Sequence, residues 1–292
     1  MASERISSEM QKFEAETGYQ YVRKIASGGY GHVYLFARKG KNQPEYVAAK
    51  FVYREIFGPP DDRGSASAYQ RALEGLQNFR SVSTESQYLL RIFDVHQRHD
   101  DGYFCYMMEL ADDVVSGRSI TPGVYRPRTL LHELERNGRR ERLPANRCVE
   151  VAITLARGLQ ILHESGFTHR DLRPANIIFV DEMPKLADID LLAGDDAALP
   201  SYIPTHYAAP EGCHSSRADI FSLGKTLYEM CTGFPVQSYP CLPFNLRHWD
   251  DHQIMLQLNR IIAKACARTL RERYGSAKSM LNDLERITWT AG

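Results

Sequence analysis

The chain has 292 residues, of which 43% are hydrophobic and 25% charged, and its 36 basic side chains balance 36 acidic ones. This length can bury a sizeable core divided between two lobes or domains, and the balanced charge argues against a binder of nucleic acid or membrane surfaces. No apolar run approaches the roughly 18 residues of a membrane span, and residues 1–13 lack the apolar block of a signal peptide. The six cysteines are scattered along the chain, which predicts free thiols in a reducing cytoplasm.

The chain begins with a segment that predicts a short amphipathic helix or a frayed lead-in, residues 3–17. Residues 19–25 then alternate apolar and polar side chains and run into the glycine-rich segment 26–36, which predicts a strand, a turn and a second strand. Glycines allow backbone amides to approach phosphates. An isolated segment of this kind is nevertheless better explained by a hairpin with a glycine bulge.

Further strands and one helix are predicted before residue 110. The strand 46–52 contains a lone lysine, Lys50, which is either a solvated edge residue or a phosphate-binding one. The glycine-rich turn just upstream favours the phosphate role. Apolar residues recur every three or four positions in residues 67–82, which indicates an amphipathic helix. Two more strands are expected at 89–96 and 103–110.

The second part of the chain is predicted to be mainly helical. Residues 112–128 form an irregular stretch that is longer than most connections, and a passive insertion explains it better than contact with a substrate. A helix is expected at 129–137. A strongly periodic helix follows at 148–165 and is capped by Gly166.

A cluster of polar side chains follows this helix. The apolar strand pair 177–180 and 185–187 brings the oxygens of Asp171, Asn176 and Asp188 to a common edge. Oxygen ligands of this kind suit Mg²⁺ that is held partly by substrate phosphates. The sequence therefore predicts a site for a nucleotide and a metal ion.

The segment that contains these residues resembles the catalytic loop of eukaryotic-type protein kinases. His169-Arg170-Asp171 and Asn176 fit the family pattern H-R-D-x-x-x-x-N, and Asp188 stands at the aspartate of the later D-F-G motif. Residues 173–179 resemble the corresponding segment of bacterial-style Ser/Thr kinases.

The resemblance covers residues 19–287 and implies an α+β fold with two lobes. The β-rich small lobe would comprise residues 1–110, with a lead-in helix, a five-stranded sheet and one helix. The larger helical lobe would comprise residues 111–292 and contain the catalytic loop and the activation segment. Together the two lobes would form one kinase domain.

The resemblance also implies a role for each site residue. Asp171 would be the catalytic base, and Arg173 would lie near the γ-phosphate. Lys50 would neutralise the phosphates of ATP and would pair with Glu74 or, failing that, with Glu85. The metal, Mg²⁺ or Mn²⁺, would lie on Asn176 and Asp188. The expected ATP contacts are Ala26, Gly28, Gly31, Val33, Ala48, Lys50, the gatekeeper Met108, and the hinge residues Glu109 and Ala111.

Two architectural pairings are implied as well. Asp219 would brace the backbone of the catalytic loop, and Arg273 would pair with Glu211 at the end of the activation segment. The hydroxyl groups in residues 191–207, which include Ser201, Tyr202, Thr205 and Tyr207, are either phosphorylation sites or ordinary polar loop residues.

Several residues depart from the family pattern. Ala26 replaces the first glycine of the glycine loop, Asp190 replaces the glycine of D-F-G, and Pro204 occupies a position where active kinases commonly have threonine. An Asp in place of Gly restricts the backbone. These departures motivate an alternative function, a pseudokinase that binds nucleotide and acts as a scaffold.

A third alternative is a small-molecule phosphotransferase, because relatives that phosphorylate metabolites often show the D-x-D pattern of residues 188–190. The segment Ala208-Ala209-Pro210-Glu211 and Asp219 argue against it. The favoured function is an ATP-dependent Ser/Thr protein kinase that works in cytoplasmic signalling, with ATP and an unidentified protein substrate as partners, no nucleic acid, and autophosphorylation as an open question.

Overall fold

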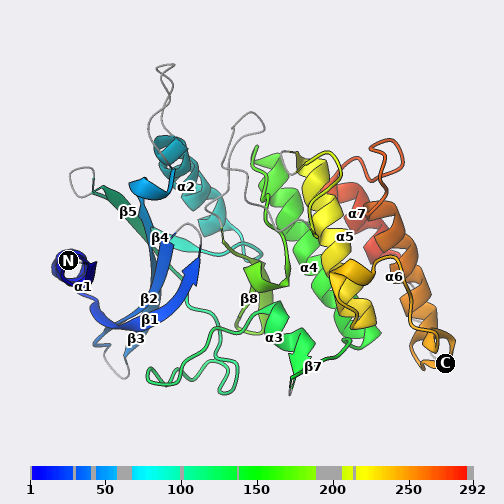
Figure 1. Cartoon of the computed structure of the whole chain (residues 1–292), viewed down its shortest axis with the longest axis horizontal. Helices are drawn as coiled ribbons and strands as arrows, with labels where there is room; N and C mark the ends of the chain where they lie inside the picture. The colour runs from blue at the N-terminus through cyan, green and yellow to red at the C-terminus, as the bar shows by residue number, and fades with distance from the viewer. Residues whose placement is uncertain are drawn as a thin grey trace.

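A computed structural model describes residues 2–28, 31–40, 44–57, 68–98, 102–136, 138–188, 206–212 and 215–287. In Figure 1 a β-sheet occupies one end of the molecule and a group of helices the other, with the N-terminus at the outer end of the sheet lobe. The protein therefore has the α+β, two-lobed architecture that the sequence predicts. Among the described residues, no helix is both long and apolar enough to span a membrane.

The sheet of the small lobe has five antiparallel strands in the order β1-β2-β3-β5-β4. The strands are β1 Gln20–Gly28, β2 Gly31–Arg38, β3 Glu45–Tyr53, β4 Ile92–Arg98 and β5 Tyr103–Met108. Because successive side chains of a strand point to opposite faces, Val47, Ala49 and Phe51 of β3 face one side of the sheet, and Lys50 faces the other.

The helix α1, Ala2–Thr17, covers the outer face of this sheet. Its Phe13 ring lies 4.5 Å from the ring of Phe36 and 5.5 Å from that of Phe51, measured between centroids. The buried Glu9 carboxylate accepts a hydrogen bond of 2.8 Å from the Tyr53 hydroxyl. The first segment of the chain is thus a packed helix and not a frayed lead-in.

The opposite face of the sheet packs on α2, Ala68–Glu85, which follows the short 3-10 helix Arg54–Phe57. The buried side of α2 carries Ala72, Leu73, Leu76 and Phe79 of the predicted periodic pattern, together with Tyr69. These residues belong to a hydrophobic core that continues into the large lobe.

The large lobe consists mainly of helices, with the β8–β9 hairpin at its boundary to the small lobe (Figure 1). Its long helices are α4 Ala145–Glu164, α5 Ser216–Thr232, α6 His252–Ala265 and α7 Ala277–Glu285. Its shorter elements are α3 Leu130–Leu134, the hairpin strands β6 Glu135–Arg136 and β7 Arg139–Arg140, the hairpin strands β8 Ile177–Val180 and β9 Met183–Leu186, and 3-10 turns at Pro174–Asn176, Val236–Ser238 and Leu246–His248.

Two predicted helix boundaries differ from the structure. The helix expected at 129–137 ends at Leu134, because the chain turns there into the β6–β7 hairpin. The helix expected from residue 148 begins three residues earlier, at Ala145, whose amide donates to the Asp251 carboxylate at 2.9 Å. Hydrogen bonds to residues distant in the sequence set this second boundary.

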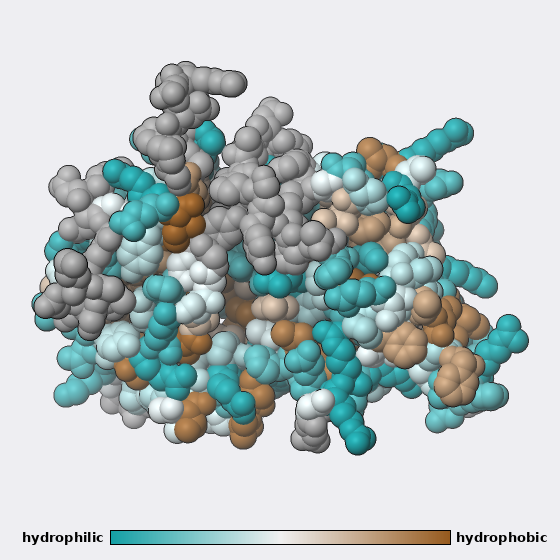
Figure 2. Space-filling model, in the orientation of Figure 1, coloured by the Kyte–Doolittle hydropathy of each residue, from teal (hydrophilic) through white to brown (hydrophobic). Residues whose placement is uncertain are grey.

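The surface of the molecule is mixed in polarity. On the face drawn in Figure 2, hydrophilic residues are spread over both lobes, and hydrophobic residues lie in separate small groups. No large apolar surface marks this face among the residues that the figure colours.

Candidate active site

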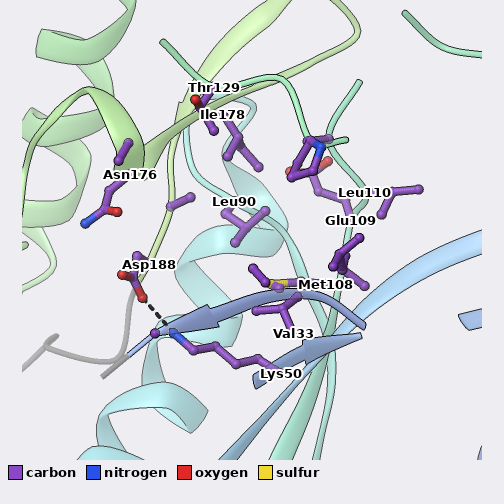
Figure 3. A pocket seen from close by; sticks show the side chains of 18 of the residues that line it. Val33, Lys50, Leu90, Met108, Glu109, Leu110, Thr129, Asn176, Ile178 and Asp188 are labelled. Atoms are coloured by element: carbon purple, nitrogen blue, oxygen red, sulfur yellow. Dashed lines mark hydrogen bonds and ion pairs between the residues drawn. The ribbon is translucent and has the colours of Figure 1, made fainter. Parts of the chain in front are cut away.

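A cavity of about 360 Å³ lies between the two lobes, where the sheet meets the β8–β9 hairpin. Figure 3 shows Val33 and Lys50 on one side of this cavity, and Thr129 and Ile178 on the other. Its lining contains apolar residues at one end and charged or amide-bearing residues at the other. The lining residues that the sequence predicts as site residues are Ala26, Gly28, Val33, Ala48, Lys50, Met108, Glu109, Ala111, Arg173, Asn176 and Asp188.

Lys50 and Asp188 meet across this cavity. Lys50 is 6% exposed, and its Nζ donates to Asp188 Oδ1 at 2.7 Å. A buried ammonium needs a partner charge, and the carboxylate supplies it. The pair thus joins a strand of the small lobe to the end of the β8–β9 hairpin, and it places a cation where phosphates could bind.

Asp171, Asn176 and Arg173 form the second polar group of the site. Asn176 Nδ2 donates to Asp171 Oδ2 at 2.8 Å and to the Asp171 carbonyl at 2.9 Å, and Arg173 Nε lies 3.3 Å from Asp171 Oδ1. Burial raises the pKa of the Asp171 carboxyl, while the Arg173 and His169 charges act in the opposite direction. A carboxylate whose pKa is raised in this way is suited to accept a proton from a hydroxyl group.

The backbone around Asp171 is held by Asp219 of α5. The Asp219 carboxylate accepts hydrogen bonds of 2.8 Å from the amides of His169 and Arg170, and it lies 2.8 Å from His163 Nε2. Arg170 has a φ of 67°, a conformation that L-residues other than glycine rarely adopt. The predicted bracing of the catalytic loop by Asp219 is confirmed.

The predicted pairing of Arg273 with Glu211 is also confirmed. The Arg273 side chain is fully buried and donates to both carboxylate oxygens of Glu211, at 2.5 and 3.1 Å. The pairing lowers the pKa of Glu211 against the effect of burial. It anchors the described end of the activation segment to the large lobe.

The hinge lies along one wall of the cavity. The Glu109 side chain does not face a ligand, because its Oε1 accepts from the amide of Arg91 at 2.8 Å and from Lys185 Nζ at 2.6 Å. No hydrogen bond among the described residues uses the Glu109 carbonyl or the Ala111 amide. The backbone of the hinge, more than its side chains, is therefore the part that can bind the base of a nucleotide.

Gly31 has a structural reason to be glycine. It does not line the cavity. Its φ is +148°, and a Cβ added to it would collide with the carbonyl oxygen of Phe51 in β3. The sequence explained this glycine by approach to phosphates, whereas the structure explains it by the close packing of β2 on β3.

Glu74 does not reach Lys50. The ion pair that the structure gives Lys50 is with Asp188, and the Glu74 side chain is exposed on α2. Glu85, the alternative partner, is exposed too, and these are the only acidic residues of α2. The expected pairing is therefore not present in this structure, because the buried side of α2 carries apolar residues at the level of the site.

Sequence reasoning missed three cavity residues in the segment before α3: Tyr125, Pro127 and Thr129. The sequence carried one signal for them: Tyr125 is the one aromatic residue of the segment 112–128, and tyrosine is often at least partly buried. Tyr125 is in fact 1% exposed.

Several predicted features lie outside the described residues: Asp190, Ser201, Tyr202, Pro204 and Thr205. Tyr207 is described. Its hydroxyl donates to the buried Glu229 carboxylate, and burial and this bond raise its pKa. A hydroxyl engaged in this way is a poor acceptor for phosphorylation in this conformation.

Among known protein families, the protein kinase domain matches residues 19–283 of this chain. The chain belongs to the protein kinase family. A probable serine/threonine-protein kinase of Clostridium perfringens is 24% identical to this kinase domain over 289 residues, which are 92% of the chain and 38% of that relative. The serine/threonine-protein kinases PknF and PknL of Mycobacterium tuberculosis are 27% and 28% identical, and the matches cover 75% and 93% of the chain.

The relatives are longer than this kinase domain. The match spans 43% of PknF and 66% of PknL. Among solved structures, the PknI kinase domain of M. tuberculosis matches with a TM-score of 0.60 at 21% identity, over 92% of this chain and 95% of that one. This likeness confirms the fold of the kinase domain.

Proposed function

We propose that this kinase domain transfers the γ-phosphoryl group of ATP to serine and threonine hydroxyls of proteins. One observation carries the proposal: Lys50 of the small lobe meets Asp188 within a cavity that Asn176 also lines, and Asn176 is bonded to Asp171. The identity of the relatives as serine/threonine kinases supports the same activity.

Each polar residue has a role in the proposed reaction. Lys50 would neutralise charge on the phosphates of ATP. Asp171 would orient the attacking hydroxyl and take up its proton. The Arg173 guanidinium, next to Asp171, would face the γ-phosphate and stabilise the charge that develops as it is transferred. In this proposal Lys50, Asp171 and Arg173 keep the roles that the sequence predicts for them. Glu74 has no role in it.

The residues present fit a Mg²⁺ or Mn²⁺ ion held largely by the substrate. Asn176 Nδ2 is engaged with Asp171, which leaves its amide oxygen as the atom for a metal, and Asp188 brings a carboxylate to the same cavity. Among the described residues no cluster of three acidic, His or Cys side chains could hold a metal alone. Two protein oxygens suit Mg²⁺, which takes its other ligands from phosphates and water, and the bound ion would supply neutralisation of phosphate charge.

We also propose the division of the chain into lobes at residues 110–111 and a cytoplasmic location. The end of β5 at Met108, just before the hinge, supports the first. The described cysteines, Cys105, Cys148, Cys231, Cys241 and Cys266, are all free thiols, which supports a reducing compartment.

Incubation with γ-labelled ATP, Mg²⁺ or Mn²⁺ and a generic protein such as casein tests the activity. Asp171→Asn should lower the rate by about 10²- to 10⁴-fold, the range of general-base contributions. Asp283→Asn is the matched control, because Asp283 lies on α7 and accepts from Tyr274 at 2.8 Å, outside the site.

The product distinguishes the proposed activity from its alternatives. Label on serine and threonine supports the proposal. Incorporation that persists in Asp171→Asn, or its absence from wild-type protein that does bind ATP, contradicts it, and the second result would favour a scaffold. Consumption of ATP with metabolites, but without labelled protein, would indicate a small-molecule phosphotransferase.

A further inference from the structure

The segment 112–128 between the hinge and α3 is an ordered loop. Asp113 Oδ1 accepts from the amides of Val115 and Ser116, each at 2.9 Å, and Oδ2 accepts from the amide of Arg126 at 2.7 Å. Burial would raise the pKa of this carboxyl, but the amide donors outweigh it and the pKa is lowered. One carboxylate thus closes the loop on itself, which a passive insertion does not require.

The loop is fixed to the rest of the molecule at its first residue and again at Gly123. The Asp112 carboxylate accepts from the amides of Asp181 and Glu182 in the β8–β9 turn, at 3.0 and 2.9 Å. Arg23 of β1 donates from Nη1 to the carbonyl of Gly123 at 2.8 Å. In Figure 1 the loop is the irregular green trace that runs below the sheet lobe. The loop is therefore attached to the small lobe as well as to the large one.

Tyr125 is the residue through which this loop reaches the cavity. Its side chain lines the cavity next to Pro127, and its hydroxyl donates to the carbonyl of Ala111 at 3.0 Å. Burial raises the pKa of the phenol, and the Asp113 and Asp112 charges act in the same direction, so the hydroxyl remains a donor throughout the working pH range. Tyr125 therefore fixes the hinge residue whose amide faces no partner among the described residues.

Three other polar side chains near this wall are already engaged. The carboxylates of Asp112 and Asp113 bind backbone amides, and Thr129 Oγ1 lies 2.8 Å from His132 Nδ1 at the start of α3. Tyr125 and Pro127 both line this wall, but Tyr125 is only 1% exposed, so its main link to the site is the hydrogen bond to the Ala111 carbonyl.

We propose that Tyr125 is a nucleotide-positioning residue, whose hydroxyl holds the Ala111 carbonyl so that the Ala111 amide is presented to the base of ATP. This inference rests on the proposed ATP-dependent function and assigns the loop 112–128 to the nucleotide site. The loop then acts as part of the binding site and not as a passive insertion.

Tyr125→Phe tests the role because it keeps the ring and removes the hydroxyl. The loss of one hydrogen bond should raise both the KM and the Kd for ATP about three- to tenfold. The kcat and the KM for the protein substrate should stay within about twofold of the wild-type values. Tyr125→Leu, which also removes the ring, should raise them further. Val124→Ala is the control, because Val124 is the preceding residue, 70% exposed, and the change should leave all four constants the same.

The outcomes separate this inference from the proposed function. Tyr125→Phe protein that melts earlier or has a lower kcat, but retains the wild-type KM and Kd for ATP, would show a merely structural tyrosine and overturn the inference. Wild-type protein that binds no ATP by calorimetry would refute the proposed function, and the positioning role with it. A selective rise in the ATP constants supports both.

Discussion

Replacement of Asp219 by asparagine should loosen the catalytic loop. Asp219 is 1% exposed, and its Oδ2 accepts from the His169 amide and faces His163, while Oδ1 accepts from the Arg170 amide, all at 2.8 Å. An asparagine can place its oxygen at only one of these positions. Its amino group would then face the Arg170 N–H, and two donors would meet in a buried site.

The magnitude follows from this geometry. A hydrogen bond to a charged group contributes about 1.5–3 kcal/mol, and a buried donor left without a partner costs about 1–3 kcal/mol. Because one such bond is replaced by a donor–donor contact, the free energy of unfolding should fall by about 1.5–3 kcal/mol. Arg170 should relax first, since its φ of 67° is itself unfavourable for an L-residue. Asp171 follows it in the chain and would move with it.

The assay compares urea unfolding with steady-state kinetics. A displacement of about 1 Å in a catalytic group can cost about 10²-fold, so we expect kcat to fall by about that factor with the KM for ATP nearly unchanged, because the Lys50–Asp188 pair is not altered. Asp283→Asn serves again as the control for the chemical change. A variant that loses less than about 1 kcal/mol and keeps kcat within threefold would refute the view that Asp219 holds the loop.

Three further changes have defined expectations. Glu74→Ala should leave kcat/KM within about twofold, because Glu74 is exposed and Lys50 pairs elsewhere; a loss comparable to that of a catalytic variant would show a second conformation of α2. Gly31→Ala should lower the free energy of unfolding by more than about 1 kcal/mol, measured in urea, because its Cβ meets backbone and its φ is positive. In the pH profile of kcat, activity should fall on the acid side as Asp171 is protonated. Arg173→Gln should move this acid limb to higher pH, because removal of the cation raises the pKa of Asp171 further. An acid limb that stays at the wild-type pH would exclude Asp171 as the titrating group.

The sequence predicted the fold and the polar centre because both depend on local patterns. Strand alternation around Lys50, the periodicity of α4 and the spacing of Asp171, Asn176 and Asp188 are each readable within a few tens of residues. The structure brings Lys50, Asn176 and Asp188 to one cavity, and Asp171, which is not among the residues that line it, is hydrogen-bonded to Asn176. Their chemical roles stay predictions until the activity is measured.

The sequence failed where distant contacts decide. The register of α2 depends on how its apolar side meets the sheet, and this left Glu74 on the outside. The order of the loop 112–128 depends on backbone amides of the β8–β9 turn, about 70 residues further on. No local pattern reports such partners, so the loop resembled an insertion and Tyr125 was not recognised as a site residue.

The position of Asp188 is set by a contact between the lobes and not by the helical lobe alone. Strand β9, which ends two residues before Asp188, pairs with the segment that leads from α2 into β4: the Leu90 amide donates to the Leu186 carbonyl at 3.0 Å, and the Leu186 amide to the Tyr88 carbonyl at 3.3 Å. Lys50 lies on the same sheet that β4 completes. The lysine and the aspartate are 138 residues apart in sequence, yet the segments that carry them are joined through one continuous set of backbone hydrogen bonds. This connection explains how two lobes can hold a phosphate-binding pair at 2.7 Å.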